Sequence, residues 1–243
     1  MTINVDAMKR NSKEIIRTAK PSVIAIGMIY VAVIMLLGYL SSSLLSGNIT
    51  ESAARKYMNM IQNGNFEGAL AYAETFKPSL PNSVINVVIR IVEWILSAGF
   101  LIFIMNTVRK TGTACVGNLL DGFGMFFRVF VLNLLITVFV ALWTLLLVVP
   151  GIIAAYKYRQ AMYILIDNPD KSPMQCIRES KQMMSGHKWE LFGLDLSFIG
   201  WFLLELLFSP VGVWTKPYIT TTRTLYYEAL KAQNSYNYNY TAV

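Results

Sequence analysis

The chain has 243 residues, of which 55% are hydrophobic and 14% are charged, against about 45–50% and about 25% in an ordinary soluble domain. This composition excludes a soluble globule and a disordered chain, because so much apolar surface must be covered by protein or lipid. Two cysteines, Cys115 and Cys176, are too few for a disulfide scaffold, and we expect free thiols. The net charge of +7 comes with Lys and Arg residues that flank apolar runs, so we expect membrane lipids and not nucleic acid as partners.

Six apolar runs predict membrane-spanning helices, since about 20 helical residues cross about 30 Å of hydrocarbon. In chain order they are residues 21–47, 83–108, 129–149, 151–166, 191–208 and 211–230. The fourth run is short and charged, and the sixth is the most polar. The predicted fold is an all-α membrane bundle of six helices in three hairpins, with residues 1–231 as one polytopic domain.

Amphipathic segments before the hairpins are expected to lie in the membrane interface on the cytoplasmic side. The first is the amino-terminal segment, where Ile15 and Ile16 lie among basic residues. The second, residues 118–128, contains glycines at 122 and 124, which predict a broken, re-entering or surface segment.

The clearest surface helix is predicted over residues 172–186. Ser172 is the expected N-cap, Pro173 the first helical residue, Gln175 the partner in a capping box, and Gly186 the end. Its apolar side chains are expected to face lipid: Met174, Cys176, Ile177 and Met184.

Residues 48–82 form a long connection with two predicted short helices, 51–62 and 66–76, separated by Asn63, Gly64 and Asn65. Pro78 and Pro81 are expected to end the second helix. At the other end of the chain, the low-complexity residues 232–243 predict a disordered cytoplasmic tail.

The prolines at 150 and 210 are each expected to end a helix and close a hairpin, because proline lacks a backbone donor. Thirteen Lys and Arg residues then lie in the connections on one side, whereas Arg55, Lys56 and Lys77 lie on the other. The positive-inside rule predicts that both termini are cytoplasmic and that residues 48–82 are external.

Ionisable residues interrupt these predicted spans, and each would cost about 2.5–3.5 kcal/mol if it faced lipid at a helix centre. Four cations, Arg90, Lys157, Arg159 and Lys216, lie about 8–12 Å from the external end by helical rise. Glu93 and Glu205 are the nearby anions. Asp195 and Arg223 lie deeper and are expected to pair with each other.

We therefore expect a wet, cationic cavity in the outer half of the bundle, suited to a phosphate or carboxylate on an amphipathic molecule. Tyr156 and Tyr163 are expected to line it as well. The candidate ligand-binding residues are Arg90, Glu93, Lys157, Arg159, Glu205, Lys216, Arg223, Tyr158 and Tyr218.

A simpler interpretation stays open beside this one. Lys157 and Lys216 lie in short spans and can extend to external headgroups, and the tyrosines can form an interfacial belt. For Arg90, Arg159 and Glu93, spacing favours interior pairing: Arg90 and Glu93 are three residues apart and lie on one helix face.

Other polar residues give no catalytic or metal pattern, so we expect no enzyme, no cofactor and no metal. His187 is the only histidine and is expected on the surface, and no phosphate-binding loop or nucleophile motif occurs. Asp167 and Asp170 are expected to lie in a solvated turn.

From Pro150 onward the sequence resembles the bacterial membrane-protein family known as domain of unknown function 975. The matching pieces are Pro150-Gly151 after LLLVV, YILIDNP at 163–169, Ser180, Met184 before GHKWELF at 186–192, SFIGW at 197–201, and Pro217-Tyr218. Asp195 and Lys216 depart from the apolar residues that this pattern leads us to expect. The resemblance implies a polytopic plasma-membrane protein of a Gram-positive bacterium and carries over no catalytic residue.

These sequence features are compatible with three functions, in order of preference. The first is a non-enzymatic membrane protein that binds or moves an anionic amphipath, either a lipid or a peptide. The second is a membrane interaction or immunity-type subunit, whose external connection at 48–82 engages a protein or peptide partner. The third is a membrane-embedded enzyme acting on lipid headgroups.

Overall fold

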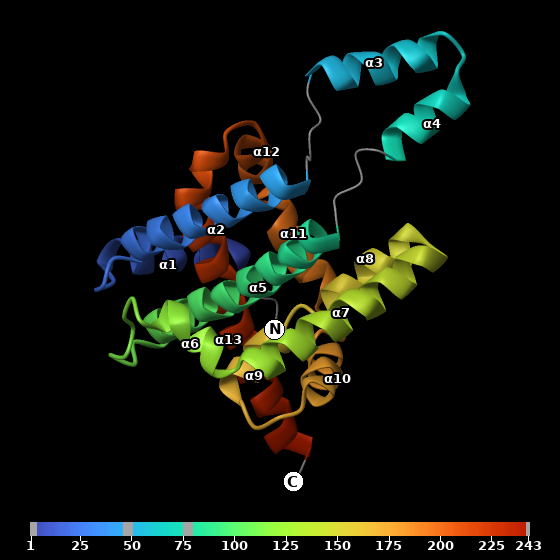
Figure 1. The fold of residues 1–243 in the computed structure, drawn as a ribbon. Coiled ribbons are helices and arrows are strands. Elements are labelled where there is room, and N and C mark those ends of the chain that lie inside the picture. Colours follow the sequence, from blue (N-terminus) through green and yellow to red (C-terminus); the bar gives the residue numbers. More distant parts are fainter. Residues whose placement is uncertain (1–3, 46–50, 75–79, 242–243) are drawn as a thin grey trace. The chain divides into compact units, whose positions relative to one another are not determined.

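The computed structural model describes residues 4–45, 51–74 and 80–241, and these residues form helices and turns without a strand (Figure 1). The helices are α1 (Val5–Thr18), α2 (Val23–Leu45), α3 (Glu51–Gln62), α4 (Phe66–Glu74), α5 (Leu80–Arg109), α6 (Asn118–Gly124), α7 (Phe126–Leu146), α8 (Val148–Lys157), α9 (Ala161–Asp167), α10 (Pro173–Met183), α11 (Lys188–Leu196), α12 (Ile199–Leu207), the 3₁₀ turn η1 (Ser209–Val211) and α13 (Gly212–Thr241). The all-α prediction is confirmed.

Three helices are long and apolar enough to cross a membrane: Val23–Ser43 in α2, Asn82–Arg109 in α5 and Phe126–Leu146 in α7. They correspond to the first three predicted spans. The fourth predicted span is divided between α8 and α9, the fifth between α11 and α12, and the sixth lies in the more polar α13. Among the described residues the structure thus supports membrane association through three candidate spans.

The chain divides into two compact units, one of Met1–Val31 with Trp94–Val243 and one of Ala32–Glu93. In the first unit, one core cluster joins the segment around α11 to α13. Its buried members are Met184, Leu191, Leu194, Phe198, Ile219, Tyr226 and Leu230. A second cluster joins the start of α2 to the carboxyl half of α5 and α6, through Val23, Ile26, Phe100, Phe103, Ile104 and Leu119.

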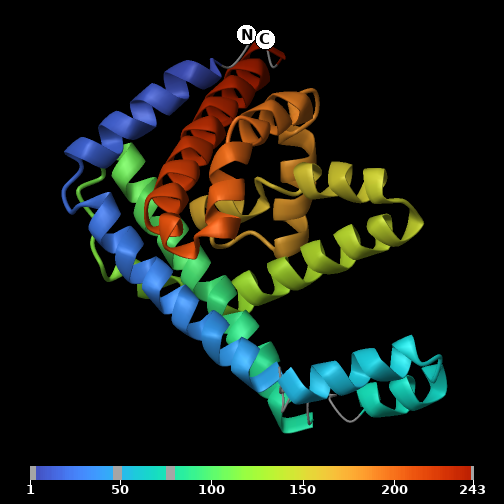
Figure 2. The ribbon, with the colours of Figure 1, turned by 90° about the horizontal axis from the view of Figure 1, so that it is seen from above.

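Helix α1 lies alongside α13 (Figure 2). The Thr222 hydroxyl donates a hydrogen bond of 2.9 Å to the Ser12 hydroxyl, and both side chains are buried. The ammonium groups of Lys9 and Lys13 lie over the rings of Phe198 and Tyr218. One face of the amino-terminal helix therefore packs on protein.

Helix α10 begins as predicted. The Ser172 side chain accepts from the Gln175 amide, the Gln175 side chain accepts from the Ser172 amide, and Pro173 is the first helical residue. The prediction that its apolar side chains face lipid is wrong for Cys176, Ile177 and Met184, which are buried. Their face packs mainly against α7 and α9. Met174 is exposed.

Helices α7 and α8 form a hairpin (Figure 2), but its turn is not at Pro150. Helix α7 ends at Leu146, Leu147 is extended, and Pro150 lies in the first turn of α8. Proline is tolerated there because first-turn amides have no intrahelical acceptor. The second predicted proline turn is confirmed, since Pro210 lies in η1 between α12 and α13.

Helices α5 and α6 approach each other through glycines. A Cβ atom at Gly99 would collide with the Leu119 carbonyl, and one at Gly122 would collide with the Ile95 carbonyl. Glycine is the residue that permits such backbone contact between helices. The segment expected to be broken or re-entering thus contains a short helix packed on α5, with Met125 between α6 and α7.

The unit of Ala32–Glu93 contains the end of α2, the helices α3 and α4, and the start of α5. Helix α3 has the predicted bounds, and Gly64 follows it with a φ of 73°. The Ser41 hydroxyl donates a hydrogen bond of 2.6 Å to the Asn86 side chain, which links α2 to α5. The predicted end of the second short helix beyond residue 74, Lys77 and Pro78 lie outside the described residues. Pro81 lies in the first turn of α5.

The carboxy-terminal segment differs from the expected disordered tail. Helix α13 continues to Thr241, and residues 242 and 243 lie outside the described residues. A helix that is already formed extends by one hydrogen bond per added residue, so a polar sequence without Gly or Pro can continue it.

Candidate functional site

A cluster of charged side chains surrounds Asp195 of α11. Arg223 of α13 donates two hydrogen bonds to Asp195 Oδ1, from Nε at 3.0 Å and from Nη2 at 2.8 Å. Arg159 Nη2 lies 3.7 Å from Asp195 Oδ2, and the Tyr156 hydroxyl donates to the same oxygen at 3.2 Å. The expected pairing of Asp195 with Arg223 is confirmed, and we call these four residues the Asp195 cluster.

The Asp195 cluster contains two guanidinium groups and one carboxylate. The Asp195 side chain is 13% exposed, whereas the Arg159 side chain is 41% exposed. Arg223 donates two short hydrogen bonds to the carboxylate, whereas Arg159 forms only one longer ion pair with it. The surplus positive charge therefore lies at Arg159, which has guanidinium donors that the carboxylate does not use.

The break between α8 and α9 positions Arg159. The buried Ser180 hydroxyl of α10 donates to the Lys157 carbonyl at 2.8 Å and accepts from the Gln160 amide at 3.1 Å. One hydroxyl thus satisfies the last carbonyl of α8 and an amide before α9, groups that a broken helix leaves without partners. Arg159 lies between them in this turn.

The other candidate residues near the α12–α13 connection form a separate ion pair. Lys216 Nζ lies 2.8 Å from Glu205 Oε1, and the Thr215 hydroxyl donates to Glu205 Oε2 at 3.2 Å. Arg90 and Glu93 lie in the other unit, where the predicted pair within α5 is confirmed at 3.0 Å. The Arg90 side chain is 66% exposed.

The remaining candidates contact aromatic rings. Lys157 Nζ lies 5.6 Å from the centre of the Trp143 ring, and the Tyr158 ring lies 6.0 Å from that of Phe139. Tyr218 packs edge-on against Phe198. Among the described residues, the candidate side chains of the larger unit thus divide into the Asp195 cluster, the Glu205–Lys216 pair and these ring contacts.

A second polar network was not predicted from the sequence. Asp167 was expected in a solvated turn, but its side chain is 3% exposed at the end of α9. Arg109 of α5 and Lys231 of α13 each pair with it at 2.6 Å, and the Tyr227 hydroxyl donates to it at 2.6 Å. Arg109 also binds Glu228 of α13. The expectation holds only for Asp170, which is fully exposed.

Burial opposes ionisation of Asp167, but hydrogen bonds from Arg109, Lys231 and Tyr227 outweigh it and hold the pKa of this carboxyl below its ordinary value. The available sequence signal was its place directly after the apolar run YILI, where a carboxylate follows a buried helix. This network joins α5, α9 and α13.

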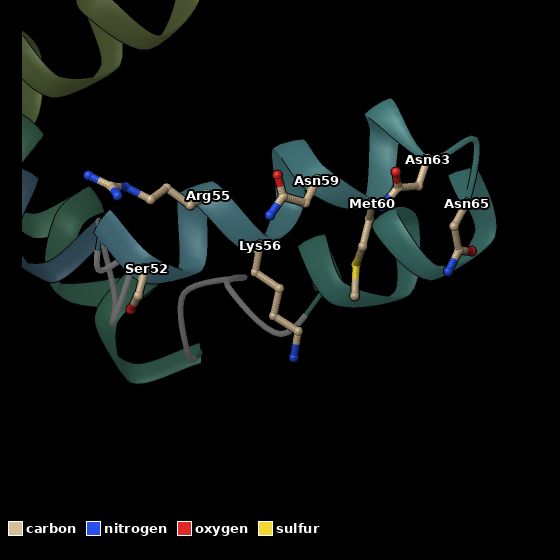
Figure 3. Close-up of a pocket in the computed structure, with 7 residues that line it drawn as sticks. All are labelled: Ser52, Arg55, Lys56, Asn59, Met60, Asn63 and Asn65. Carbon is tan, nitrogen blue, oxygen red and sulfur yellow. The ribbon is translucent and has the colours of Figure 1, made fainter.

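Two pockets lie away from the candidate residues. One, of about 420 Å³, lies in the unit of Ala32–Glu93 and is lined by Ser52, Arg55, Lys56, Asn59, Met60, Asn63 and Asn65 (Figure 3). The other, of about 370 Å³, lies in the larger unit where the α1–α2 connection meets the end of α5.

Comparison with known proteins adds one match. Residues 144–234 match the model of a family described as "Protein of unknown function (DUF975)", and this segment includes the whole Asp195 cluster and the Glu205–Lys216 pair. No curated protein and no solved structure matches the chain. Over residues 144–234, the chain is thus similar to the DUF975 family.

Proposed function

We propose that this chain is a non-enzymatic, multi-pass protein of a bacterial cell membrane that binds or moves an anionic amphipath, and that it holds the anionic group at the Asp195 cluster. In this proposal six segments cross the membrane and both termini are cytoplasmic. The observation that carries it is the charge imbalance of the cluster, in which Arg159 and Arg223 share one carboxylate.

The two arginines differ in a way that suits a ligand site. Arg223 is held by two short hydrogen bonds and positions Asp195. Arg159 is held by one longer contact and is more exposed, so a phosphate or carboxylate can bind its unused donors. Such charge-assisted hydrogen bonds are stronger than neutral ones and favour a ligand with a full negative charge.

Exposed aromatic rings beside the cluster supply the apolar part of the proposed site. The Tyr156 ring packs edge-on against Phe192, which packs in the same way against Trp189. Phe192 and Trp189 are both exposed. A ligand with its anionic group at Arg159 can place a hydrocarbon chain along these rings, which is why we propose an amphipath and not a small inorganic anion.

The experiment is native mass spectrometry of the full chain purified in mild detergent, which identifies the lipid or peptide that remains bound. Arg159→Gln is expected to lower the affinity for the bound molecule at least tenfold, and so to lower the fraction that remains bound, because hydrogen bonds to a charged group contribute about 1.5–3 kcal/mol. The matched control is Arg128→Gln, since Arg128 makes only a 3.9 Å contact with the exposed Asp170. Equal retention of the ligand by wild type and both variants would refute the proposal.

One observation favours the second function, an interaction subunit that acts through the external connection. In the unit of Ala32–Glu93, α3 and α4 form a helical pair with exposed apolar side chains, namely Met58, Phe66 and Leu70. Replacing residues 51–74 with a Gly-Ser linker separates the two functions. Loss of a cross-linked partner with unchanged lipid retention would support the interaction subunit.

A further inference from the structure

Figure 2 shows the connection between α1 and α2 beside the loop that joins α5 to α6. A pocket of about 370 Å³ is lined by residues of both segments. Its walls come from the end of α1, the α1–α2 connection, the end of α5 and the start of the α5–α6 loop. The lining residues that matter below are Ile15, Thr18, Lys20, Asn106, Thr107 and Lys110.

The pocket is cationic. Lys20 and Lys110 are both exposed, and neither forms an ion pair with another residue in the part of the chain that the structure describes. Elsewhere in this unit several cations near the membrane have a carboxylate partner, as Lys216 has Glu205 and Arg109 has Asp167. The two pocket lysines therefore leave their positive charge available to a ligand.

Lys110 occupies a backbone position that favours glycine. Its φ is 53°, and it follows the last residue of α5, Arg109. The Lys110 amide donates to the Thr107 carbonyl and the Thr111 amide donates to the Asn106 carbonyl. These two bonds define a Schellman cap, in which the residue at the left-handed position is usually glycine. A lysine is uncommon in this conformation.

Two of the last carbonyl groups of α5, those of Asn106 and Thr107, have hydrogen-bond donors. The Asn106 carbonyl accepts from both the amide and the hydroxyl of Thr111, and the Thr107 carbonyl accepts from Lys110. The Schellman cap thus satisfies these carbonyl groups. Thr18 and Thr107 also line the pocket, and their hydroxyl groups donate to the Glu14 and Phe103 carbonyls.

The pocket lies beside the ends of two candidate spans. The first begins at Val23, three residues after Lys20, and the second ends at Arg109, one residue before Lys110. Both lysines therefore lie next to the end of an apolar helix, where a membrane-spanning helix leaves the hydrocarbon. Each lysine at such a position contributes about 1 kcal/mol to the binding free energy of anionic lipids.

From these observations we propose that the pocket binds the phosphate group of an anionic phospholipid from the leaflet at this end of the helices. Lys20 and Lys110 neutralise the phosphate, and Ile15 contacts the glycerol backbone. This site is separate from the Asp195 cluster and does not depend on the function proposed for it.

The test is titration of the purified full chain with dioleoyl phosphatidylglycerol, with bound lipid read by native mass spectrometry. Lys20→Gln and Lys110→Gly are each expected to weaken binding about fivefold, which is about 1 kcal/mol per lysine. Phosphatidylcholine, in which an ammonium group offsets the phosphate, is expected to bind less than phosphatidylglycerol.

Lys110→Gly also separates binding from folding. Glycine fits the left-handed cap better than lysine does, so this variant is expected to unfold at the same temperature as the wild type or higher. Lys181→Gln is the matched control, since Lys181 is exposed on α10 and does not line the pocket. It removes the same charge and is expected to leave phosphatidylglycerol binding unchanged.

Three outcomes would overturn the proposal. Unchanged binding in Lys20→Gln and Lys110→Gly would show that the pocket does not hold the lipid. An equal loss in Lys181→Gln would show a general charge effect. Competition by soluble glycerol 3-phosphate at millimolar concentration would assign the pocket to a free phosphate ester. Arg159→Gln is expected to bind phosphatidylglycerol here like the wild type, so failure at one site is distinguishable from failure at the other.

Discussion

The carboxylate of Asp167 accepts hydrogen bonds from side chains of two other helices, Arg109 of α5 and both Tyr227 and Lys231 of α13. A buried carboxylate with these partners is stable as an anion, and its loss leaves Arg109 and Tyr227 without their acceptor. The network therefore joins three helices through one side chain, and it ties the carboxyl end of a candidate span to α13.

The depressed pKa of Asp167 predicts a pH dependence of stability. Its stabilising effect is fully present above the unfolded-state pKa of about 3.9 and is lost as the pH falls through the lower folded-state pKa. Asp167→Asn is expected to lower the free energy of unfolding by about 1–3 kcal/mol at pH 7. The difference between wild type and variant should shrink below about pH 4. Denaturant unfolding in detergent at several pH values measures this difference in the free energy of unfolding. A difference that stays constant down to about pH 3 would contradict the prediction.

For single residues, the sequence predicts ion pairs within one helix better than ion pairs between helices. Arg90 and Glu93 pair as their spacing of three residues indicates. The position of Asp195 and Arg223 along their spans was enough to expect that pair. Arg109 and Asp167 lie far apart in the sequence, on helices that only the tertiary fold brings together. No local sequence pattern therefore predicts their contact.

Among the elements, the contact between α5 and α6 depends on two glycines. Gly99→Ala is expected to lower the free energy of unfolding by about 1–3 kcal/mol, because the added Cβ would collide with the Leu119 carbonyl. The matched control is Gly193→Ala in α11, where an added Cβ meets no atom within 4 Å. That variant should gain about 0.5–1 kcal/mol from helix propensity. Thermal unfolding of both variants in the same detergent shows whether each substitution raises or lowers the unfolding temperature. Equal changes in unfolding temperature would show that the α5–α6 packing tolerates a methyl group.

Element boundaries were predictable where their signal is local. The capping box at Ser172 and the Asn63-Gly64-Asn65 turn are chemical signals within a few residues, and α10 and α3 begin and end near them. The break between α8 and α9 contains neither Gly nor Pro. It depends on the Ser180 hydroxyl of another helix, so the apolar run at 151–166 predicted one span where the structure has two helices.

At the scale of the whole molecule, composition predicted an association with lipid, because no soluble core can bury this much apolar side chain, and the six apolar runs predicted an all-α fold. It did not predict that the apolar face of α10 packs on α7 and α9. An amphipathic helix presents the same pattern to lipid and to protein, and only the tertiary fold decides between them. Orientation across the membrane rests on the distribution of Lys and Arg and stays a prediction.

The native cysteines test that orientation. Cys115 is exposed in the connection between α5 and α6, whereas Cys176 is buried and its thiol pKa is raised by burial and by Glu179. A membrane-impermeant maleimide should reach Cys115 only after permeabilisation, if this connection is cytoplasmic. Cys176 should react only after denaturation, because the reactive thiolate is both shielded and disfavoured.

The external side needs a cysteine of its own. In a Cys115→Ser background, Glu67→Cys places a thiol at an exposed position in the first turn of α4, within the connection predicted to be external. This thiol should react in intact cells at the rate of an exposed residue. Because the two sites are predicted on opposite sides, labelling of Cys115 in intact cells together with protection of residue 67 would invert the topology. It would then place the lysine pocket in the external leaflet, and the lysine substitutions would still report on the same phosphate.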